Sequence, residues 1–177
     1  MTQNRPQASE YAPYYEKYVA MVPDGEIVET LEAQLREMKL LLGTLSEKGA
    51  EFRYEAGKWS IKEVLGHISD TERVFAYRLL RIARGDQTPL AGFEQDDYVK
   101  TGNFSARSLA ALLEEFTAVR RATIVLLRPL DEAAWLRRGV ANHKEISVRA
   151  LAFILAGHER HHRVVLQERY FPALPRG

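Results

Sequence analysis

Three of the five histidines in this sequence lie close together near its C-terminal end, in Gly157-His158-Glu159-Arg160-His161-His162-Arg163. His158 and His162 are four residues apart, so on an α-helix they project from the same face, about 40° apart. The flanking apolar residues keep the same spacing of three and four, which directs both imidazoles inward: Val148, Leu151, Leu155, Val165 and Leu166. Two inward imidazoles one turn apart have the geometry with which a helix binds a metal ion.

The same pair has a second interpretation, in which both histidines are hydrogen-bonded core residues. Each imidazole brings a polar nitrogen that needs a buried partner, so two of them are harder to satisfy than one. The pair alone leaves both interpretations open. His161 lies about 100° from the inward stripe, on its flank. We leave a role for His161 or Glu159 undecided.

The composition is that of one ordinary globular domain. The chain has 177 residues, of which 46% are hydrophobic and 28% charged, and this length suits a single domain with a sizeable core. The formal net charge is +1, from 25 basic and 24 acidic residues. Such a balance gives no field that attracts nucleic acid or an anionic membrane. We therefore expect neither among the partners, and a small-molecule substrate instead.

The sequence contains no cysteine. Disulfides, thiolate zinc sites and a cysteine nucleophile are therefore excluded, and any metal must be held by nitrogen and oxygen. The first residues lack the apolar run of a signal peptide. The most apolar stretch, residues 150–157, is too short to span a bilayer. We expect a cytoplasmic protein.

Four amphipathic helices are predicted, and no segment shows the alternation of a strand. Their expected ranges are 26–48, 61–84, 105–128 and 147–170, with one short helical turn at 131–136. Asp24 is the expected N-cap of the first helix and Gly49 its stop. Ser60-Ile61-Lys62-Glu63 has the pattern of a capping box at the start of the second. The fold class is all-α, a four-helix bundle.

Two further segments complete the expected organisation. Residues 1–23 are rich in tyrosine and proline and predict an irregular arm, packed on the body by its aromatic rings. Residues 24–177 form the bundle domain. The connection 85–104, about twenty residues, is long for a bundle. Its length lets the second and third helices run parallel.

A third imidazole can come from the second helix. His67 lies sideways from that helix's apolar stripe, along the seam with a neighbour. It stands about 10 Å above the Ser60 cap, at 1.5 Å per residue. If the second and fourth helices are antiparallel neighbours, His67 reaches a height similar to that of His158 and His162. His143, in a polar loop, is expected at the surface.

Two segments of the sequence resemble the signatures of a known family. Residues 59–73, Trp-Ser-Ile-Lys-Glu-Val-Leu-Gly-His-Ile-Ser-Asp-Thr-Glu-Arg, resemble the helix-two signature of the DinB/YfiT-like superfamily, and residues 157–162 resemble its helix-four signature. The likeness extends over residues 24–170. It implies a bundle of up-down-down-up order with a long crossover between helices two and three. It also implies a divalent metal bound by three histidines, matched here by His67, His158 and His162.

The resemblance also suggests chemistry. Some relatives are thiol S-transferases that use small thiols such as bacillithiol, and a mycothiol-dependent maleylpyruvate isomerase is a more distant relative. Others have been called metal-dependent hydrolases. The resemblance thus points to the metal more directly than to a substrate.

A rival motif overlaps the same residues. His158-Glu159-x-x-His162 fits H-E-x-x-H, the zinc-protease pattern in which the glutamate is a general base. Only fifteen residues follow His162, and Glu168, the sole acid among them, is too close to be the third ligand. We therefore disfavour a peptidase. Glu159 is expected instead to be a surface acid that pairs with Arg163 at i+4.

Three neutral imidazoles suit zinc or nickel and leave a coordination position open. We expect a metal-dependent enzyme that activates a small-molecule thiol for transfer, with its catalytic residues unknown. The first alternative is a metal-dependent hydrolase. The second is a non-enzymatic metal-binding protein of stress response or interaction. Bundles of this kind can also pair, so a homodimer is kept among the expectations.

Overall fold

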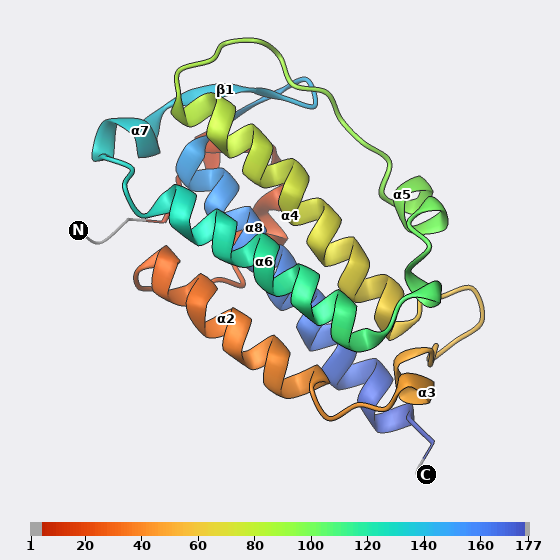
Figure 1. The fold of residues 1–177 in the computed structure, drawn as a ribbon. Helices are drawn as coiled ribbons and strands as arrows, with labels where there is room; N and C mark the ends of the chain where they lie inside the picture. The colour runs from red at the N-terminus through yellow and green to blue at the C-terminus, as the bar shows by residue number, and fades with distance from the viewer. Residues whose placement is uncertain (1–4, 176–177) are drawn as a thin grey trace.

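The computed structural model describes residues 5–175, and four long helices dominate it (Figure 1). They are α2 (Ile27–Leu42), α4 (Ile61–Ala83), α6 (Leu109–Leu127) and α8 (Val148–Val165). Helices α2 and α8 run in one direction, and α4 and α6 run in the other. The predicted four-helix bundle of up-down-down-up order is confirmed.

Serine caps set the starts of three of these helices. Ser60 accepts a hydrogen bond from the backbone N–H of Glu63 (3.2 Å), and the Glu63 carboxylate accepts one from the backbone N–H of Ser60 (2.7 Å). This is the predicted capping box. Ser147 begins α8 as predicted, whereas α6 begins after Ser108, later than the predicted start at residue 105. Gly85, in the left-handed region with φ +82°, follows the end of α4.

The first predicted helix is shorter than expected. It ends at Leu42, so the prediction of a helix to residue 48 was wrong. Ser46 begins a separate short helix, α3 (Glu47–Ala50), and its hydroxyl accepts a hydrogen bond from the Gly49 N–H (3.1 Å). A serine cap competes with helix continuation, because it satisfies the backbone N–H groups of a new first turn. The start was also misplaced, since Glu26 occupies the N-cap position in place of Asp24.

The long crossover between α4 and α6 carries structure of its own. It contains α5 (Gln95–Thr101) and the 3₁₀ turn η3 (Phe104–Ala106). The Phe104 ring packs against Gly66, where a Cβ atom would overlap it. Gly66 therefore lets the crossover approach α4 directly beside His67.

A small hairpin, which was not predicted, precedes α8. Strands β1 (Arg138–Ala141) and β2 (Lys144–Ser147) pair in antiparallel register. The two turn residues, Asn142 and His143, have φ of 49° and 62°, as in the turns that match the twist of a hairpin. Strands of four residues are too short to show alternation, which explains the wrong prediction. His143 is exposed, as expected, and α7 (Glu132–Leu136) is the predicted short helical turn.

The N-terminal arm lies along α8 (red in Figure 1). It contains three short helical segments, η1 (Ala8–Glu10), η2 (Pro13–Tyr15) and α1 (Glu16–Val19). The rings of Tyr11 and Tyr15 are buried. Residues 1–4, and residues 176–177 at the other end, lie outside the described part. The domain division at 23/24 stays a prediction.

A buried polar layer divides the core. Two apolar clusters fill the bundle, and on each long helix buried polar residues fall between them in sequence. Among these residues are Gln34 on α2, Glu72 on α4, Arg120 on α6, and His158 and Glu159 on α8. After α8 the chain continues through the π turn η4 (Leu166–Tyr170) and the 3₁₀ turn η5 (Phe171–Ala173), close to the predicted end.

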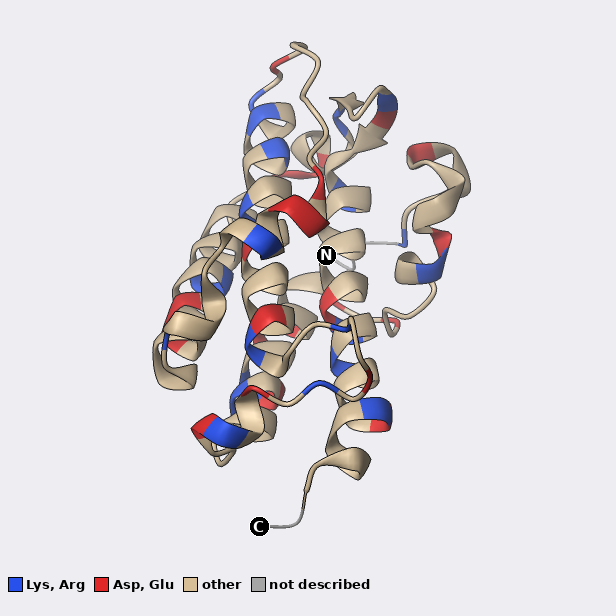
Figure 2. Cartoon of the chain, turned by 90° about the vertical axis from the view of Figure 1, so that its right-hand side faces the viewer, with Lys and Arg blue, Asp and Glu red and all other residues tan. Residues whose placement is uncertain are grey.

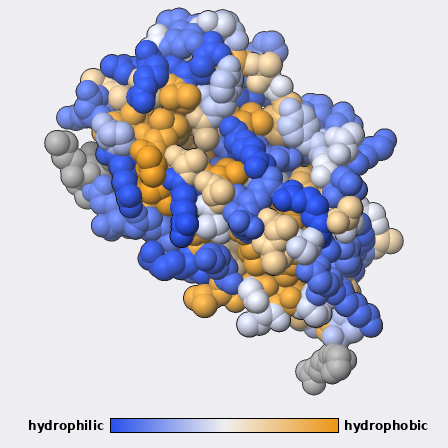
Figure 3. Space-filling view, in the orientation of Figure 1, coloured by the Kyte–Doolittle hydropathy of each residue, from blue (hydrophilic) through white to orange (hydrophobic). Residues whose placement is uncertain are grey.

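Charges of both signs are interspersed over the helices (Figure 2), in line with the net charge of +1. Apolar side chains reach the surface in separate patches (Figure 3), and the most exposed are Leu40 and Val125. Among residues 5–175, none of the helices combines the length and apolar character that a membrane span requires. The homodimer stays an expectation.

Candidate metal centre

The structure brings three imidazoles together from two antiparallel helices. His67 Nε2 on α4 lies 3.0 Å from His158 Nε2 on α8, and His162 Nε2 lies 3.1 Å from the same atom. The ligand atoms of all three residues lie within 4.8 Å of one another. Residues 91 positions apart thus share one point, as the matched heights predicted.

The chemistry of the three nitrogens fits a cation. A neutral imidazole nitrogen carries either one proton or one lone pair. His158 Nε2 faces two neighbours and cannot satisfy both of them by hydrogen bonds. Tetrahedral zinc at about 2.0–2.1 Å from each nitrogen needs nitrogens about 3.3 Å apart. The separations of His158 Nε2 from the other two nitrogens, 3.0 and 3.1 Å, are close to that value. The ligand atoms of His67 and His162 also lie within 4.8 Å of each other, so the three residues suit one divalent ion.

Burial keeps the three imidazoles neutral. His67 is 2% exposed and His158 8%, while His162 is half-buried. Burial lowers the pKa of His67 to about 4. Burial is the main cause that holds the pKa of His158 and His162 well below the usual value, and electrostatic repulsion from the neighbouring imidazoles is the next. Neutral rings at pH 7 have the free lone pairs that a metal requires.

Two neighbours orient the His67 ring. The Thr71 hydroxyl lies 3.5 Å from His67 Nδ1, at the outer limit of a hydrogen bond. The Trp59 ring packs at 4.8 Å between centroids. A partner on the nitrogen away from the metal fixes which ring nitrogen carries the proton. Thr71 can therefore direct the His67 Nε2 lone pair toward the other two rings.

A comparison of the sequence with models of known families identifies the family of this chain. The family model described as DinB superfamily matches residues 30–166 and so includes all three histidines. The chain belongs to the DinB superfamily.

A solved structure supports the same fold for this DinB-superfamily protein. YfiT from Bacillus subtilis superposes with a TM-score of 0.71 at 16% sequence identity, covering 93% of this chain and 90% of that one. YfiT is described as a probable metal-dependent hydrolase with an unusual four-helix bundle topology. None of the curated proteins matches the chain.

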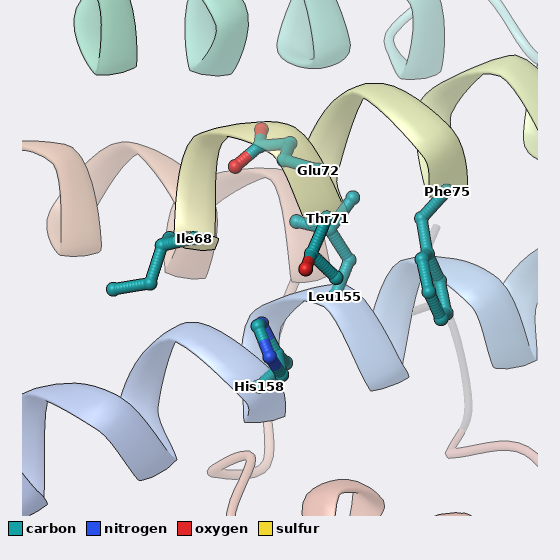
Figure 4. A pocket seen from close by; sticks show the side chains of 6 residues that line it. All are labelled: Ile68, Thr71, Glu72, Phe75, Leu155 and His158. Carbon is teal, nitrogen blue, oxygen red and sulfur yellow. The ribbon is translucent and has the colours of Figure 1, made fainter. Parts of the chain in front are cut away.

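A small cavity lies beside His158, between α4 and α8 (Figure 4). Its volume is about 10 Å³, the space of about one water molecule. It is lined by Ile68, Thr71, Glu72, Phe75, Leu155 and His158. A substrate does not fit there. The half-buried His162 marks the more accessible side of the three histidines.

A buried hydrogen-bond network connects all four long helices beside the histidines. Arg120 Nε on α6 donates to both carboxylate oxygens of Glu72 on α4, at 2.9 Å each. Its Nη1 donates to Gln34 Oε1 on α2 (2.9 Å), and Gln34 Nε2 donates to the Ala156 carbonyl on α8 (2.8 Å). The network therefore fixes α8 two residues before His158.

The prediction that Glu159 lies at the surface was wrong. Its carboxylate pairs with Arg163 at 3.2 Å, as expected, but the residue is fully buried. Helix α2 covers this side of α8, where Arg163 also meets Glu37 (2.8 Å). Burial raises the pKa of Glu159 to about 7, although the charges of Arg120 and Arg163 oppose the rise.

The peptidase interpretation gains no support from Glu159. The group of converging ligand atoms in residues 5–175 contains three histidines and no glutamate. His161 lies outside this group as well, with its ring centroid 5.1 Å from that of His162. The H-E-x-x-H spacing is present, but Glu159, which would be the general base, is fully buried on the side of α8 that faces α2 and pairs there with Arg163.

Sequence reasoning missed several residues around the centre. Glu72 and Arg120 occupy inward positions: Glu72 follows Ile68 by four residues and Arg120 follows Phe116 by four. A charged residue at such a position is a signal for a buried pair. Tyr18 belongs to the predicted aromatic arm, but its position beside His158 had no comparable signal, because it depends on how separate segments pack.

Proposed function

We propose that this DinB-superfamily protein is a metal-dependent enzyme that transfers a small-molecule thiol to an electrophile. His67, His158 and His162 would hold one divalent ion, with zinc or nickel favoured by three imidazole donors. The observation that carries the proposal is the position of His158 Nε2 between two other Nε2 atoms, at 3.0 and 3.1 Å. When bound, such an ion lowers the pKa of a thiol or water in its open position.

The side chains of this protein suit that use. In residues 5–175 the group of converging ligand atoms contains three residues, and a site with three protein ligands retains room for an exogenous one. His162 is the least buried of the three and borders the side from which a substrate can arrive. The sequence has no cysteine, so the attacking sulfur must belong to a cosubstrate.

A metal-dependent hydrolase is the second candidate. The description of YfiT as a probable metal-dependent hydrolase favours it. The same three imidazoles would serve both reactions, since the open position accepts either a thiol or water. A protein in which the metal only fastens α4 to α8 is the third candidate.

One experiment separates the three. Protein purified without an affinity tag is loaded with zinc or nickel and assayed against electrophiles, esters and amides, with and without 2-mercaptoethanol or free cysteine. We expect turnover that requires both metal and thiol and is lost in His162→Ala but kept in His161→Ala. Metal-dependent turnover without thiol would support the hydrolase. A metal-loaded protein inert across the panel would support the structural role and contradict the enzyme.

A further inference from the structure

The N-terminal arm contributes an aromatic side chain to the border of the metal centre. The Tyr18 ring lies edge-on to His158, with centroids 5.5 Å apart, and edge-on to His161 at 5.6 Å. His161 in turn lies against His162. Tyr18 is therefore next to one candidate ligand, His158, and one ring away from another, His162.

A glycine permits this approach. A Cβ atom on residue 157 would overlap the Tyr18 carbonyl and lie 2.9 Å from the Tyr18 Cα. Only glycine allows the arm backbone to lie so close to α8, one residue before His158. The backbone of the arm therefore packs directly against α8 beside His158.

A buried ion pair holds the arm in that position. Glu10 is 3% exposed. It accepts hydrogen bonds from Arg149 Nε (2.7 Å) and from the Ser147 hydroxyl (2.6 Å). Both partners belong to the start of α8. The arm therefore has one anchor on α8 before Tyr18 and a close backbone contact at Tyr18 itself.

Lys17 brings a positive charge to the same border. Its Nζ lies 4.8 Å from the centroid of the Tyr18 ring, within the range of a cation–π contact. Lys17 is exposed and forms no ion pair within residues 5–175.

Two acidic residues of neighbouring segments, Glu16 and Glu37, have other partners. Glu16, which precedes Lys17, accepts a hydrogen bond from the Tyr11 hydroxyl (2.6 Å). Glu37, on α2, pairs with Arg163. We propose that Lys17, held on the Tyr18 ring, selects substrates that carry a carboxylate or other anionic group close to the atom that binds the metal. This inference rests on the metal site of the proposed function.

The expected size of the effect is modest. A pair of unit charges about 4 Å apart in water gains about fivefold in affinity, and exposed pairs commonly less. We therefore expect anionic ligands to bind about two- to fivefold more tightly than neutral ones at low ionic strength. The preference should fall as salt is added, because exposed charges are screened.

The test uses full-length protein loaded with cobalt(II), whose visible spectrum reports ligands that enter the metal's coordination. Two series of probes differ in charge at constant donor chemistry. The first is imidazole-4-acetate, imidazole and histamine. The second is 3-mercaptopropionate, 2-mercaptoethanol and cysteamine. Dissociation constants are compared for wild type, Lys17→Gln, Lys17→Glu and the control Lys144→Gln, an exposed lysine of β2.

We expect wild type and Lys144→Gln to prefer the anionic probe, Lys17→Gln to lose the preference, and Lys17→Glu to favour the cationic probe. Cobalt binding should be equal in all four proteins. A preference that survives in Lys17→Gln, or equal affinities across charge in wild type, would overturn the role of Lys17. Failure of the thiols alone, with the preference intact for the imidazole series, would contradict thiol transfer and leave this inference standing. Absence of binding in both series would overturn the inference.

Discussion

Arg120 on α6 lies with its Nε 2.9 Å from both carboxylate oxygens of Glu72 on α4, and both side chains are almost completely buried. Through Gln34 the pair extends to the Ala156 carbonyl on α8. These residues occupy the polar layer between the two apolar clusters, beside the three histidines. We interpret the ion pair, together with Gln34, as the interaction that holds α4 and α8 in the register at which His67 contacts His158.

The first prediction concerns this pair. Arg120→Met leaves a buried carboxylate without its partner, so the free energy of unfolding should fall by about 3–5 kcal/mol. Urea unfolding of the metal-free protein measures the change. The double variant Arg120→Met, Glu72→Gln should recover part of the loss, because it removes the isolated charge.

A control for this prediction lies at the C-cap of the same helix, α6. Arg128 pairs with Glu32 at the surface, with side-chain exposures of 59% and 33%. Arg128→Met should therefore cost about 0–1 kcal/mol. Equal losses for Arg120→Met and Arg128→Met would contradict the account of a buried network.

The second prediction concerns acid stability. Burial alone raises the pKa of Glu10, but hydrogen bonds from Arg149 and Ser147 outweigh it and lower the pKa to about 2. The unfolded chain binds a proton near the ordinary value of 4.5. The contribution of Glu10 is therefore present above pH 4.5 and is lost as the pH falls toward 2, on the order of 3 kcal/mol in all.

The measurement is the free energy of unfolding between pH 2 and 6, for wild type and Glu10→Gln. The variant should be less stable at pH 6 and show a shallower loss between pH 4.5 and 2. Amide exchange at residues 8–19 should also accelerate in the variant, since the arm loses its anchor. Parallel pH curves for the two proteins would argue against the anchoring role.

The third prediction concerns Thr71. Thr71→Val removes the hydroxyl that lies 3.5 Å from His67 Nδ1. Loss of such an outer partner typically weakens metal binding about tenfold or more. Competition titration with a chelating dye gives the affinity. Thr123→Val is the matched control, because Thr123 is a buried helical threonine whose hydroxyl donates to the Val119 carbonyl. An unchanged affinity in Thr71→Val would remove Thr71 from the centre.

Local signals made much of the fold predictable. Ser60 with Glu63, Ser147 and Gly85 mark helix ends by hydrogen bonds or backbone conformation within a few residues, and these boundaries were right. His158 and His162 share a face because helix geometry alone requires it. The length of the crossover indicated the unusual helix order, since a short loop cannot return the chain to the start of a parallel neighbour.

Other features depend on contacts that the sequence does not display. The inward apolar stripe of α8 identifies one covered face, but not the second face, where α2 buries Glu159. Tyr18 reaches His158 only because Gly157 admits the arm, and no periodicity links residues so far apart. The sequence contains a signal for the cap at Ser46, but a continuous helix fitted the same residues. It also contains a turn signal at Asn142-His143, but a polar loop fitted those residues equally well.

The most direct test of the central claim is metal content by elemental analysis of protein purified without an affinity tag. We predict one divalent ion per chain in wild type, loss of it in His67→Ala, His158→Ala and His162→Ala, and retention in His161→Ala. Equal metal content in all four variants, or none in wild type after loading with zinc or nickel, would contradict the three-histidine centre.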